Sequence, residues 1–332
     1  LPLTPITMFN KKHTDICLIG AGPVGLLAAH VLTDNQIEFI QFDSAAGPHT
    51  HSYALALLPE TLELLERIGV AGPVLAEARK VPRVALYHGE ERKAELDYTQ
   101  VNSAFPYLSV IRQCELENIL LDTLKAKGHH PHWHHRVRYM TEADDHVAVE
   151  VDRIMEGMTG YAYAHIDMQI DKILQYRANY VIGADGHRSA ARRVAGIDYE
   201  ETDAAQTCAV FEFQSDRELP DEMRIIVDAE GTHIFWPMAD NYCRWSFEVH
   251  PGTDLPGADG ETHYMVDAGK NAYPLLDETH LAGFLSQHAQ WFKGNPVTMR
   301  WRTLVNFQKR MAGSFGRDRL WLAGDAAHLT AP

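Results

Sequence analysis

The chain has 332 residues, of which 45% are hydrophobic and 23% charged, and its formal net charge is −15. This length allows one large or two ordinary domains with a sizeable buried core. The negative charge argues against non-specific binding to nucleic acid or to an anionic membrane surface, because like charges repel.

Two further absences narrow the class of protein. No run of 18 apolar residues occurs, so no membrane-spanning helix is predicted. The four cysteines lie far apart and form no CxxC pair, which argues against a zinc site or a disulfide framework and favours a reduced, cytoplasmic setting. They are Cys17, Cys114, Cys208 and Cys243.

The segment from Asp15 to Asp43 predicts a strand–turn–helix–strand unit. Residues 16–19 form a short apolar run, typical of a strand buried on both faces. Residues 24–32 are rich in Ala and Leu and predict a helix, and residues 37–42 alternate like a second strand. Strand, turn, helix and strand in this order are typical of a dinucleotide-binding unit.

Three glycines in GxGxxG spacing follow the first strand. Gly20 permits a tight turn, Gly22 lets the backbone approach a pyrophosphate, and Gly25 allows close packing of helix on strand. The helix N-terminus then offers unpaired N–H groups to phosphates. Asp43 lies where an acid can bind ribose hydroxyls, which favours FAD or NAD(H) over NADP(H) as the ligand of this unit.

Three later segments extend the pattern. Residues 111–128 predict an amphipathic helix, with Arg112 and Gln113 at its start. An apolar strand runs into Asp185-Gly186, and another runs into Gly324-Asp325. On its own, the first segment could be a helix capped by solvated polar residues. The strand–DG and strand–GD segments, taken alone, are common turn chemistry.

Together and in this order, these motifs resemble the FAD-dependent aromatic hydroxylases, the p-hydroxybenzoate hydroxylase-like flavoprotein monooxygenases. The motifs are GxGxxG, an RQxxLE-like segment at Arg112, DGxxSxxR at Asp185 and GDAAHxxxP at Gly324. The resemblance spans nearly the whole chain. It implies an α/β fold in which a Rossmann-like FAD-binding domain is interleaved with a smaller substrate domain on a mixed, largely antiparallel sheet.

The resemblance also implies roles for individual residues. The three glycines and Asp43 would bind the pyrophosphate and the adenosine ribose. Arg112 would approach the flavin phosphate and ribityl region, and Asp325, after Gly324, would bind the ribityl chain. The remaining expected cofactor contacts are Asp185, Gly186 and Pro332. One departure is visible, because many relatives have an arginine where this chain reads HTHSYALALL; His51, Ser52 or Tyr53 is expected in that region.

The expected domain boundaries follow from the same resemblance. The FAD-binding domain is assigned residues 14–80, 110–198 and 312–332, and the substrate domain residues 81–109 and 199–311. Three segments of the substrate domain, TCAVFEFQ, GTHIFWPM and CRWSFEVH, alternate like adjacent strands. Their bulky residues are expected to be mostly core, while Phe235, Trp236 and Pro237 fall where the family often lines the substrate pocket.

The histidine-rich segment GHHPHWHH, residues 128–135, raises the question of a metal site. We read it as a strand after the helix, in which alternate histidines point to opposite faces. No physiological metal site is therefore predicted, and no Ser/His/Asp triad or carboxylate pair emerges from spacing. His328 is interpreted as part of the flavin loop.

The resemblance implies a monooxygenase cycle. NADPH or NADH reduces FAD, reduced flavin forms a C4a-hydroperoxide with O2, and this intermediate hydroxylates an aromatic or similar electron-rich small molecule. The alternatives are a flavin-linked dehydrogenase or reductase, a halogenase of the same superfamily, or a flavin-binding protein without turnover. The substrate, the choice of nicotinamide and the oligomeric state stay open.

The last twelve residues, WLAGDAAHLTAP, match the first half of a flavin-binding motif. In the resembled family this stretch continues into a Gly-rich turn and a long helix, whose amides support charge on the reduced flavin. We therefore expect the natural polypeptide to be longer than these 332 residues, and the shorter chain to bind FAD less tightly.

Overall fold

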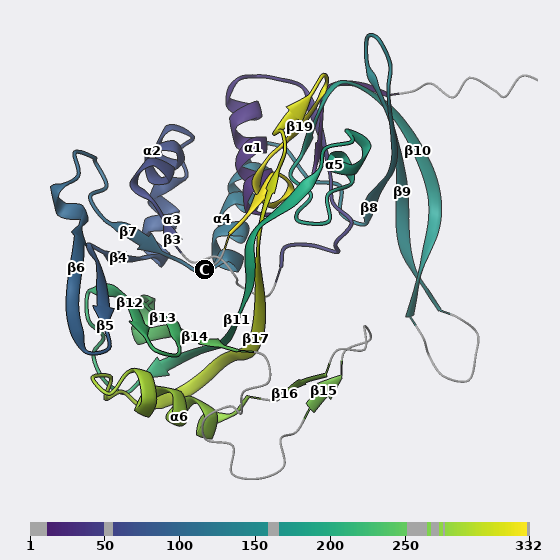
Figure 1. The fold of residues 1–332 in the computed structure, drawn as a ribbon. Helices are drawn as coiled ribbons and strands as arrows, with labels where there is room; N and C mark the ends of the chain where they lie inside the picture. Colours follow the sequence, from purple (N-terminus) through teal and green to yellow (C-terminus); the bar gives the residue numbers. More distant parts are fainter. Residues whose placement is uncertain are drawn as a thin grey trace, which may run out of the picture. The chain divides into compact units, whose positions relative to one another are not determined.

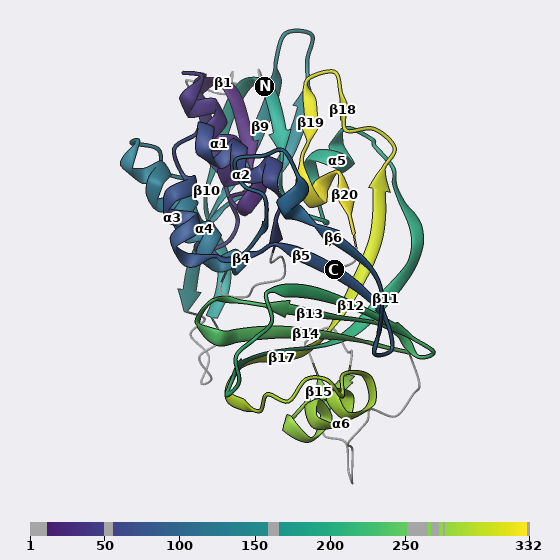
Figure 2. The ribbon, with the colours of Figure 1, turned by 90° about the vertical axis from the view of Figure 1, so that its left-hand side faces the viewer.

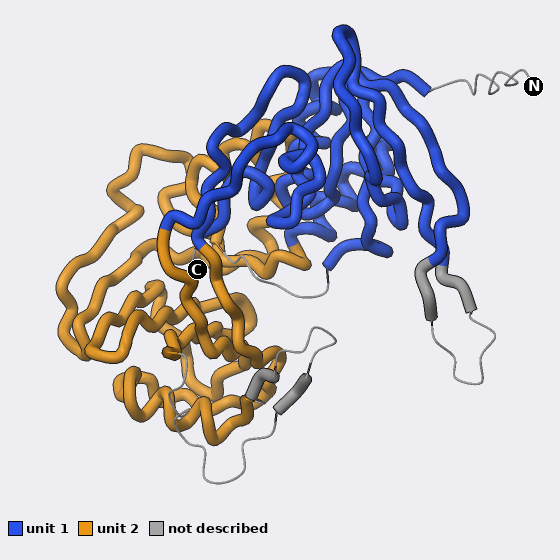
Figure 3. Tube along the Cα trace, turned by 45° about the vertical axis from the view of Figure 1, so that its right-hand side comes forward, with its two compact units in different colours: residues 1–52, 116–202, 309–330 blue, residues 53–115, 203–308, 331–332 orange. Residues whose placement is uncertain are grey.

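The computed structural model describes residues 12–49, 56–158, 166–250, 264–266, 272–274 and 276–330, and Figures 1 and 2 show its ribbon from two directions. The chain divides into two compact units (Figure 3). Unit 1 comprises residues 1–52, 116–202 and 309–330, and unit 2 comprises residues 53–115, 203–308 and 331–332. Both units are thus assembled from separate stretches of chain, as the resemblance implies.

Unit 1 contains a parallel sheet of the doubly wound kind. Its strands run in the order β18-β19-β10-β1-β2, with β9 and then β8 added through β10. Strands β19, β10, β1 and β2 pair in parallel, whereas β18, β9 and β8 pair antiparallel. The bounds are β1 (Lys12–Ile19), α1 (Pro23–Asp34), β2 (Phe39–Phe42), β8 (His135–Glu142), β9 (Val147–Met158), β10 (Ile166–Gly183), α5 (Ala190–Val194), β18 (Gly316–Arg317), β19 (Leu320–Leu322), η3 (Gly324–Ala326) and β20 (His328–Leu329).

Helices cover the sheet of unit 1, with α1 and α4 on one side and α5 on the other (Figure 1). Helix α4 (Gln113–Ala126) begins in unit 2 and continues in unit 1. Cys17 and Ile19 belong to the core cluster that also contains Ala191 of α5. On the other side, His30 of α1 contacts the backbone carbonyl of Leu120 at 2.8 Å, which fastens α1 to α4.

Unit 2 is built on a mixed, mostly antiparallel sheet. Its strands run β17-β11-β14-β13-β12-β5-β6, and a small sheet has the order β3-β7-β4. The bounds are β3 (Ala56–Leu57), α2 (Pro59–Arg67), α3 (Ala71–Glu77), β4 (Arg79–Val81), β5 (Arg83–His88), β6 (Glu91–Asp97), η1 (Tyr98–Gln100), β7 (Leu108–Val110), β11 (Tyr199–Ser215), β12 (Glu222–Asp228), β13 (Gly231–Pro237), η2 (Ala239–Asn241), β14 (Tyr242–Val249), β15 (Tyr264–Val266), β16 (Ala272–Pro274), α6 (Glu278–His288) and β17 (Pro296–Ala312).

Helix α6 covers one face of this sheet and closes an aromatic core (Figure 2). The three alternating segments TCAVFEFQ, GTHIFWPM and CRWSFEVH contain six Phe and Trp residues. Five of the six are fully buried in this core, which confirms that they are core: Phe211, Phe213, Phe235, Trp245 and Phe247. Trp236, on the opposite face of β13, is half-buried against a second cluster. The three alternating segments are also confirmed as adjacent strands, because β14 pairs with both β11 and β13.

A strand follows the helix, as predicted, but its predicted start within the histidine-rich segment is wrong. Strand β8 begins only at His135, and the residues before it make a single isolated bridge, between Phe42 and His132. His134 has a φ of 57°, a left-handed conformation that no regular strand contains. Local alternation misled here because the segment is a turn that returns the chain toward β2.

The compact units and the expected domains divide the chain differently over residues 53–80 and 110–115, and also over the short stretches 199–202, 309–311 and 331–332. The small sheet joins β3 to β7 and β7 to β4, so residues 53–115 stay together in unit 2. The assignment of the stated ranges to an FAD-binding and a substrate domain remains a prediction. Among the described residues, no helix is long and apolar enough to cross a membrane.

Candidate functional site

The motifs of unit 1 meet at one edge of its parallel sheet. Strands β2, β1, β10 and β19 end at neighbouring positions, and a motif residue follows each within two residues. Backbone N–H groups join these ends, from Gly20 to Phe42 at 2.8 Å, from Ala184 to Ile19 at 2.7 Å and from Ala323 to Gly183 at 2.9 Å. Ligands of open α/β sheets bind outside such carboxyl ends.

The glycine turn has the geometry that its spacing predicts. Gly20 has a φ of +100°, and a Cβ there would overlap the carbonyl of Ala184. A Cβ on Gly25 would overlap the carbonyl of Gly20, so helix α1 packs directly on the turn. A Cβ on Gly22 meets no atom within 4 Å. The turn is therefore closed on the sheet side and open at Gly22, where α1 begins.

Asp43 lies over the same turn. Its Oδ2 accepts a hydrogen bond from the backbone N–H of Ala21 at 2.7 Å, and its Oδ1 accepts one from Ala45 at 2.8 Å. Each carboxylate oxygen can accept a further hydrogen bond. The two backbone contacts fix the orientation of the acid, and this leaves capacity for hydroxyl donors such as those of a ribose.

Asp185 and Gly186 follow β10. Oδ2 of Asp185 accepts a hydrogen bond from the N–H of Ala190 at 2.6 Å, and thereby caps the start of α5. Its Oδ1 is buried and has no hydrogen-bond partner among the described residues. Gly186 has a φ of +74°, and a Cβ there meets no atom within 4 Å. A buried carboxylate oxygen without a partner is costly unless a ligand supplies one.

Gly324 and Asp325 follow β19 and pack on α1. Gly324 has a φ of +61°, and a Cβ there would lie 2.9 Å from Cγ2 of Val24. The side chain of Asp325 remains open to solvent, yet the protein atoms around it remove part of its hydration and raise its pKa, against the attraction of His187 and His328. The motif at Gly324 thus packs against α1, the helix that begins at the glycine turn.

Arg192 connects two of the motif loops at this edge, a role that the sequence did not predict. Its guanidinium donates to the carbonyls of Ala326 at 2.8 Å and His187 at 2.7 Å, and so ties the third motif to the fourth. It also lies 3.7 Å from the ring centroid of Tyr199, whose hydroxyl donates to the carbonyl of Asp325 at 2.8 Å. Its place in DGxxSxxR was the only available signal.

The remaining predicted site residues are not brought to this edge by the described contacts. Arg112 belongs to unit 2, where its guanidinium pairs with Glu212 at 3.2 Å and Glu115 at 3.4 Å. Phe235 is buried in the aromatic core, and Trp236 and Pro237 continue β13. The following predicted residues lie outside the described residues: His51, Ser52, Tyr53 and Pro332.

Comparisons with known proteins agree with this geometry. A family model described as an FAD binding domain matches residues 13–332. The chain is 28% identical, over 96% of its length, to a 6-methylpretetramide 4-monooxygenase of Streptomyces rimosus, of which it covers 51%. It is 25% identical, over 97% of its length, to a 3-(3-hydroxy-phenyl)propionate/3-hydroxycinnamic acid hydroxylase of Mycolicibacterium smegmatis, of which it covers 51%. The chain thus spans about half the length of these curated relatives.

Solved structures share the fold. A p-nitrophenol 4-monooxygenase from Pseudomonas putida DLL-E4 superposes with a TM-score of 0.73 at 21% identity, over 97% of this chain and 75% of that one. A flavin-dependent monooxygenase in complex with FAD and substrate gives a TM-score of 0.72 at 17% identity, over 96% of this chain and 54% of that one.

Proposed function

The chain belongs to the family of FAD binding domains, and on that premise we propose that it holds FAD in a monooxygenase. The proposed reaction consumes NADPH or NADH and O2 and hydroxylates an aromatic or similar electron-rich small molecule. The relatives support this substrate class, since their names describe a 4-monooxygenase and a hydroxylase of a hydroxyphenyl acid. The flavin intermediate expected from the sequence stays a prediction.

One observation carries the proposal: three of the four motifs, at Gly20, Asp185 and Gly324, meet with Asp43 at the carboxyl edge of one parallel sheet. At that edge a Cβ on Gly22 or Gly186 would meet no atom of the described residues within 4 Å. The buried Oδ1 of Asp185 has no hydrogen-bond partner in the described part of the chain. The free N–H groups at the start of α1 and the acid Asp43 complete a set of donors and acceptors suited to a dinucleotide. The residues present therefore fit FAD.

Each group at the edge has a proposed task. Gly20, Gly22 and the first turn of α1 bind the pyrophosphate, and Asp43 accepts hydrogen bonds from the adenosine ribose. Asp185 and Asp325 offer acceptors to the remaining hydroxyls. When bound, FAD supplies hydride acceptance from the nicotinamide and activation of O2, while the protein orients the reactants and excludes water.

Residues of unit 2 complete the proposal. Arg112 and Pro332 are proposed to contact the flavin because they belong to the RQxxLE-like and GDAAHxxxP motifs. For the substrate, Trp236 and Pro237 remain the proposed pocket residues, whereas Phe235 shapes the pocket only through the core in which it is buried. A cytoplasmic setting belongs to the same proposal, supported by four cysteines that are all buried and unpaired.

The test is a coupled assay on purified, FAD-loaded protein with a panel of phenols. We expect substrate-dependent oxidation of NADPH or NADH, matching uptake of O2, and a product that carries one atom from isotopically labelled O2. Nicotinamide oxidation that proceeds equally without O2 would instead indicate a dehydrogenase or reductase. Chloride- or bromide-dependent product would indicate a halogenase, and FAD binding without any turnover a flavin-binding protein.

A further inference from the structure

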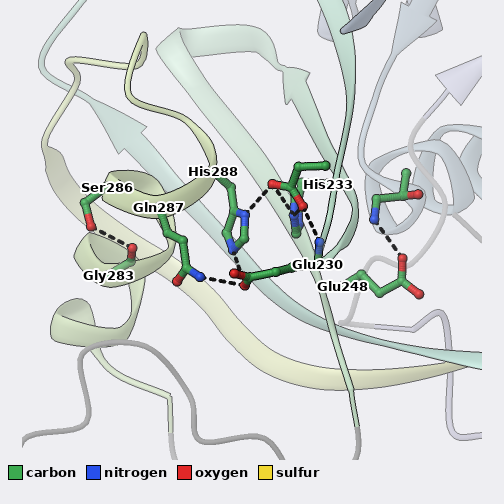
Figure 4. Close-up of polar contacts among 9 residues, drawn as sticks. Glu230, His233, Glu248, Gly283, Ser286, Gln287 and His288 are labelled. Carbon is green, nitrogen blue, oxygen red and sulfur yellow. Dashed lines mark hydrogen bonds and ion pairs between the residues drawn. The ribbon is translucent and has the colours of Figure 1, made fainter. Parts of the chain in front are cut away.

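Three potential metal ligands that belong to none of the sequence motifs meet in unit 2. Asp228 ends β12, His233 lies on β13, and His288 ends α6. One ligand atom from each lies within 4.8 Å of the other two. The Nδ1 of His288 is 2.7 Å from Oδ2 of Asp228, and Nε2 of His233 is 3.3 Å from both carboxylate oxygens. Figure 4 shows both imidazoles turned toward this point.

The hairpin between β12 and β13 orients the carboxylate. Its turn brings Asp228 opposite Gly231, and the backbone N–H of Glu230 donates to Oδ1 of Asp228 at 2.8 Å. This bond occupies one oxygen from the side of the turn. The other oxygen, Oδ2, is left facing the two histidines.

An outer layer orients His288. Its second nitrogen, Nε2, lies 3.7 Å from Oε2 of Glu230, and the same oxygen accepts a hydrogen bond from Gln287 at 2.5 Å (Figure 4). A carboxylate behind the far nitrogen of a histidine is the usual second layer of a metal site, where it fixes the ring and raises its basicity. Here Glu230 and Gln287 provide that layer.

Both imidazoles lie in the interior of unit 2. His233 is fully buried and His288 nearly so. Imidazole nitrogens are common ligands of divalent transition metals.

We propose that Asp228, His233 and His288 bind one zinc-class divalent transition-metal ion, with water as the fourth ligand. Two imidazoles and a carboxylate suit Zn²⁺ better than Mg²⁺ or Ca²⁺, which prefer oxygen ligands. Ligand atoms about 3.3 Å apart fit a tetrahedral ion with bonds of about 2.0 Å. The 3.3 Å contacts of His233 with Asp228 already match, and the His288–Asp228 contact must lengthen by about 0.6 Å. The two imidazole rings, whose centroids lie 3.8 Å apart, must also separate when the ion binds.

The ion would fasten the end of α6 to the β12–β13 hairpin. The alternative is a metal-free network in which both histidines donate to Asp228. Because the protein supplies three ligands, the fourth ligand is a water molecule that can exchange with solvent. The two readings differ in whether the folded chain takes up a metal.

The experiment titrates the chelator-treated, FAD-loaded chain with Co²⁺ and then Zn²⁺. We expect one equivalent of Co²⁺ to produce ligand-field bands to the red of the flavin absorption, and one equivalent of Zn²⁺ to abolish them. Asp228→Asn and His288→Gln should abolish the bands. Glu230→Gln should weaken Zn²⁺ binding about 10- to 100-fold, the usual effect of losing an outer-layer partner.

The matched control is His130→Gln, which removes an exposed imidazole from the histidine-rich segment of unit 1. It should leave the cobalt spectrum unchanged. Absence of bands in the folded wild-type chain would overturn the proposal without recourse to any variant. Bands that persist in both Asp228→Asn and His288→Gln, or vanish in His130→Gln, would also overturn it and assign the ion to another site. Circular dichroism and retained FAD establish that each variant is folded.

Discussion

The two units form their polar sites from different parts of the chain: unit 1 mainly from backbone groups and unit 2 from side chains. The edge of unit 1 is made largely of backbone, with glycines whose missing side chains let N–H groups and carbonyls approach each other and a ligand. The Asp228–His233–His288 cluster of unit 2 is made of side chains beside a packed aromatic core. We therefore expect the stability and ligand affinity of the unit 1 edge to fall when a side-chain carbon is added. The stability of the unit 2 region should fall when side-chain atoms are removed.

The largest effect is expected in the aromatic core of unit 2. Phe247 stacks on Trp245 at 5.1 Å and on Phe284 at 4.8 Å between ring centroids. Phe247→Ala should lower the free energy of unfolding by about 3–5 kcal/mol, because it leaves a cavity. Denaturant unfolding followed by tryptophan fluorescence measures this. Val297→Ala, at an exposed position, is the control and should change it by less than about 0.5 kcal/mol.

Adding one carbon atom at Gly20 is the counterpart in unit 1. Gly20→Ala places a Cβ on the Ala184 carbonyl at a positive φ, so we expect a loss of about 3 kcal/mol from overlap and backbone strain together. The same denaturation experiment, followed by far-ultraviolet circular dichroism, detects it. A fully stable Gly20→Ala protein would show that the turn is looser than described.

Gly22→Ala separates binding from folding at the same turn. The new Cβ meets no protein atom and the φ of −74° is ordinary, so stability should change by less than about 0.5 kcal/mol. FAD affinity should fall about tenfold or more, as expected from the loss of one charge-assisted hydrogen bond to the pyrophosphate. Flavin fluorescence titration measures the change. Unaltered affinity would move the pyrophosphate away from Gly22.

The smallest effect is expected at the start of α6. Asp277 caps the helix by accepting hydrogen bonds from the N–H groups of Thr279 and His280. Burial opposes ionisation of Asp277, but hydrogen bonds from the Thr279 hydroxyl and the His280 N–H outweigh it and hold the pKa of the carboxyl below the usual range. Asp277→Ala should cost about 1 kcal/mol. Because the folded pKa is depressed, the contribution is present above the ordinary aspartate pKa and is lost as pH falls below it. Asp277→Asn should keep the cap and lose this pH dependence.

The extent to which these regions could be predicted reflects how locally each is encoded. The turn at Gly20 and the helix after it depend on a few consecutive residues, so spacing alone located them. Strand β10, by contrast, has 18 residues, because β9 pairs with it antiparallel well beyond the apolar stretch recognised in the sequence. No local pattern records that pairing.

The metal-ligand cluster shows the same limit for sites. His288 lies 60 residues after Asp228, and only the packing of α6 on the sheet brings them together. The clustered histidines of GHHPHWHH drew attention because they are adjacent in sequence, although they form a turn. Arg112 was recognised by its motif, but its pairing with Glu212 depends on β11, about a hundred residues further along the chain.

The central claim is that the carboxyl edge of the unit 1 sheet holds FAD. Its most direct test is a titration of the flavin-free chain with FAD, read by flavin absorbance after gel filtration, for the wild type and Gly22→Ala side by side. We predict one FAD per wild-type chain and markedly weaker uptake by the equally folded variant. A folded wild-type chain that takes up no FAD, or a variant that binds it equally well, would contradict the claim.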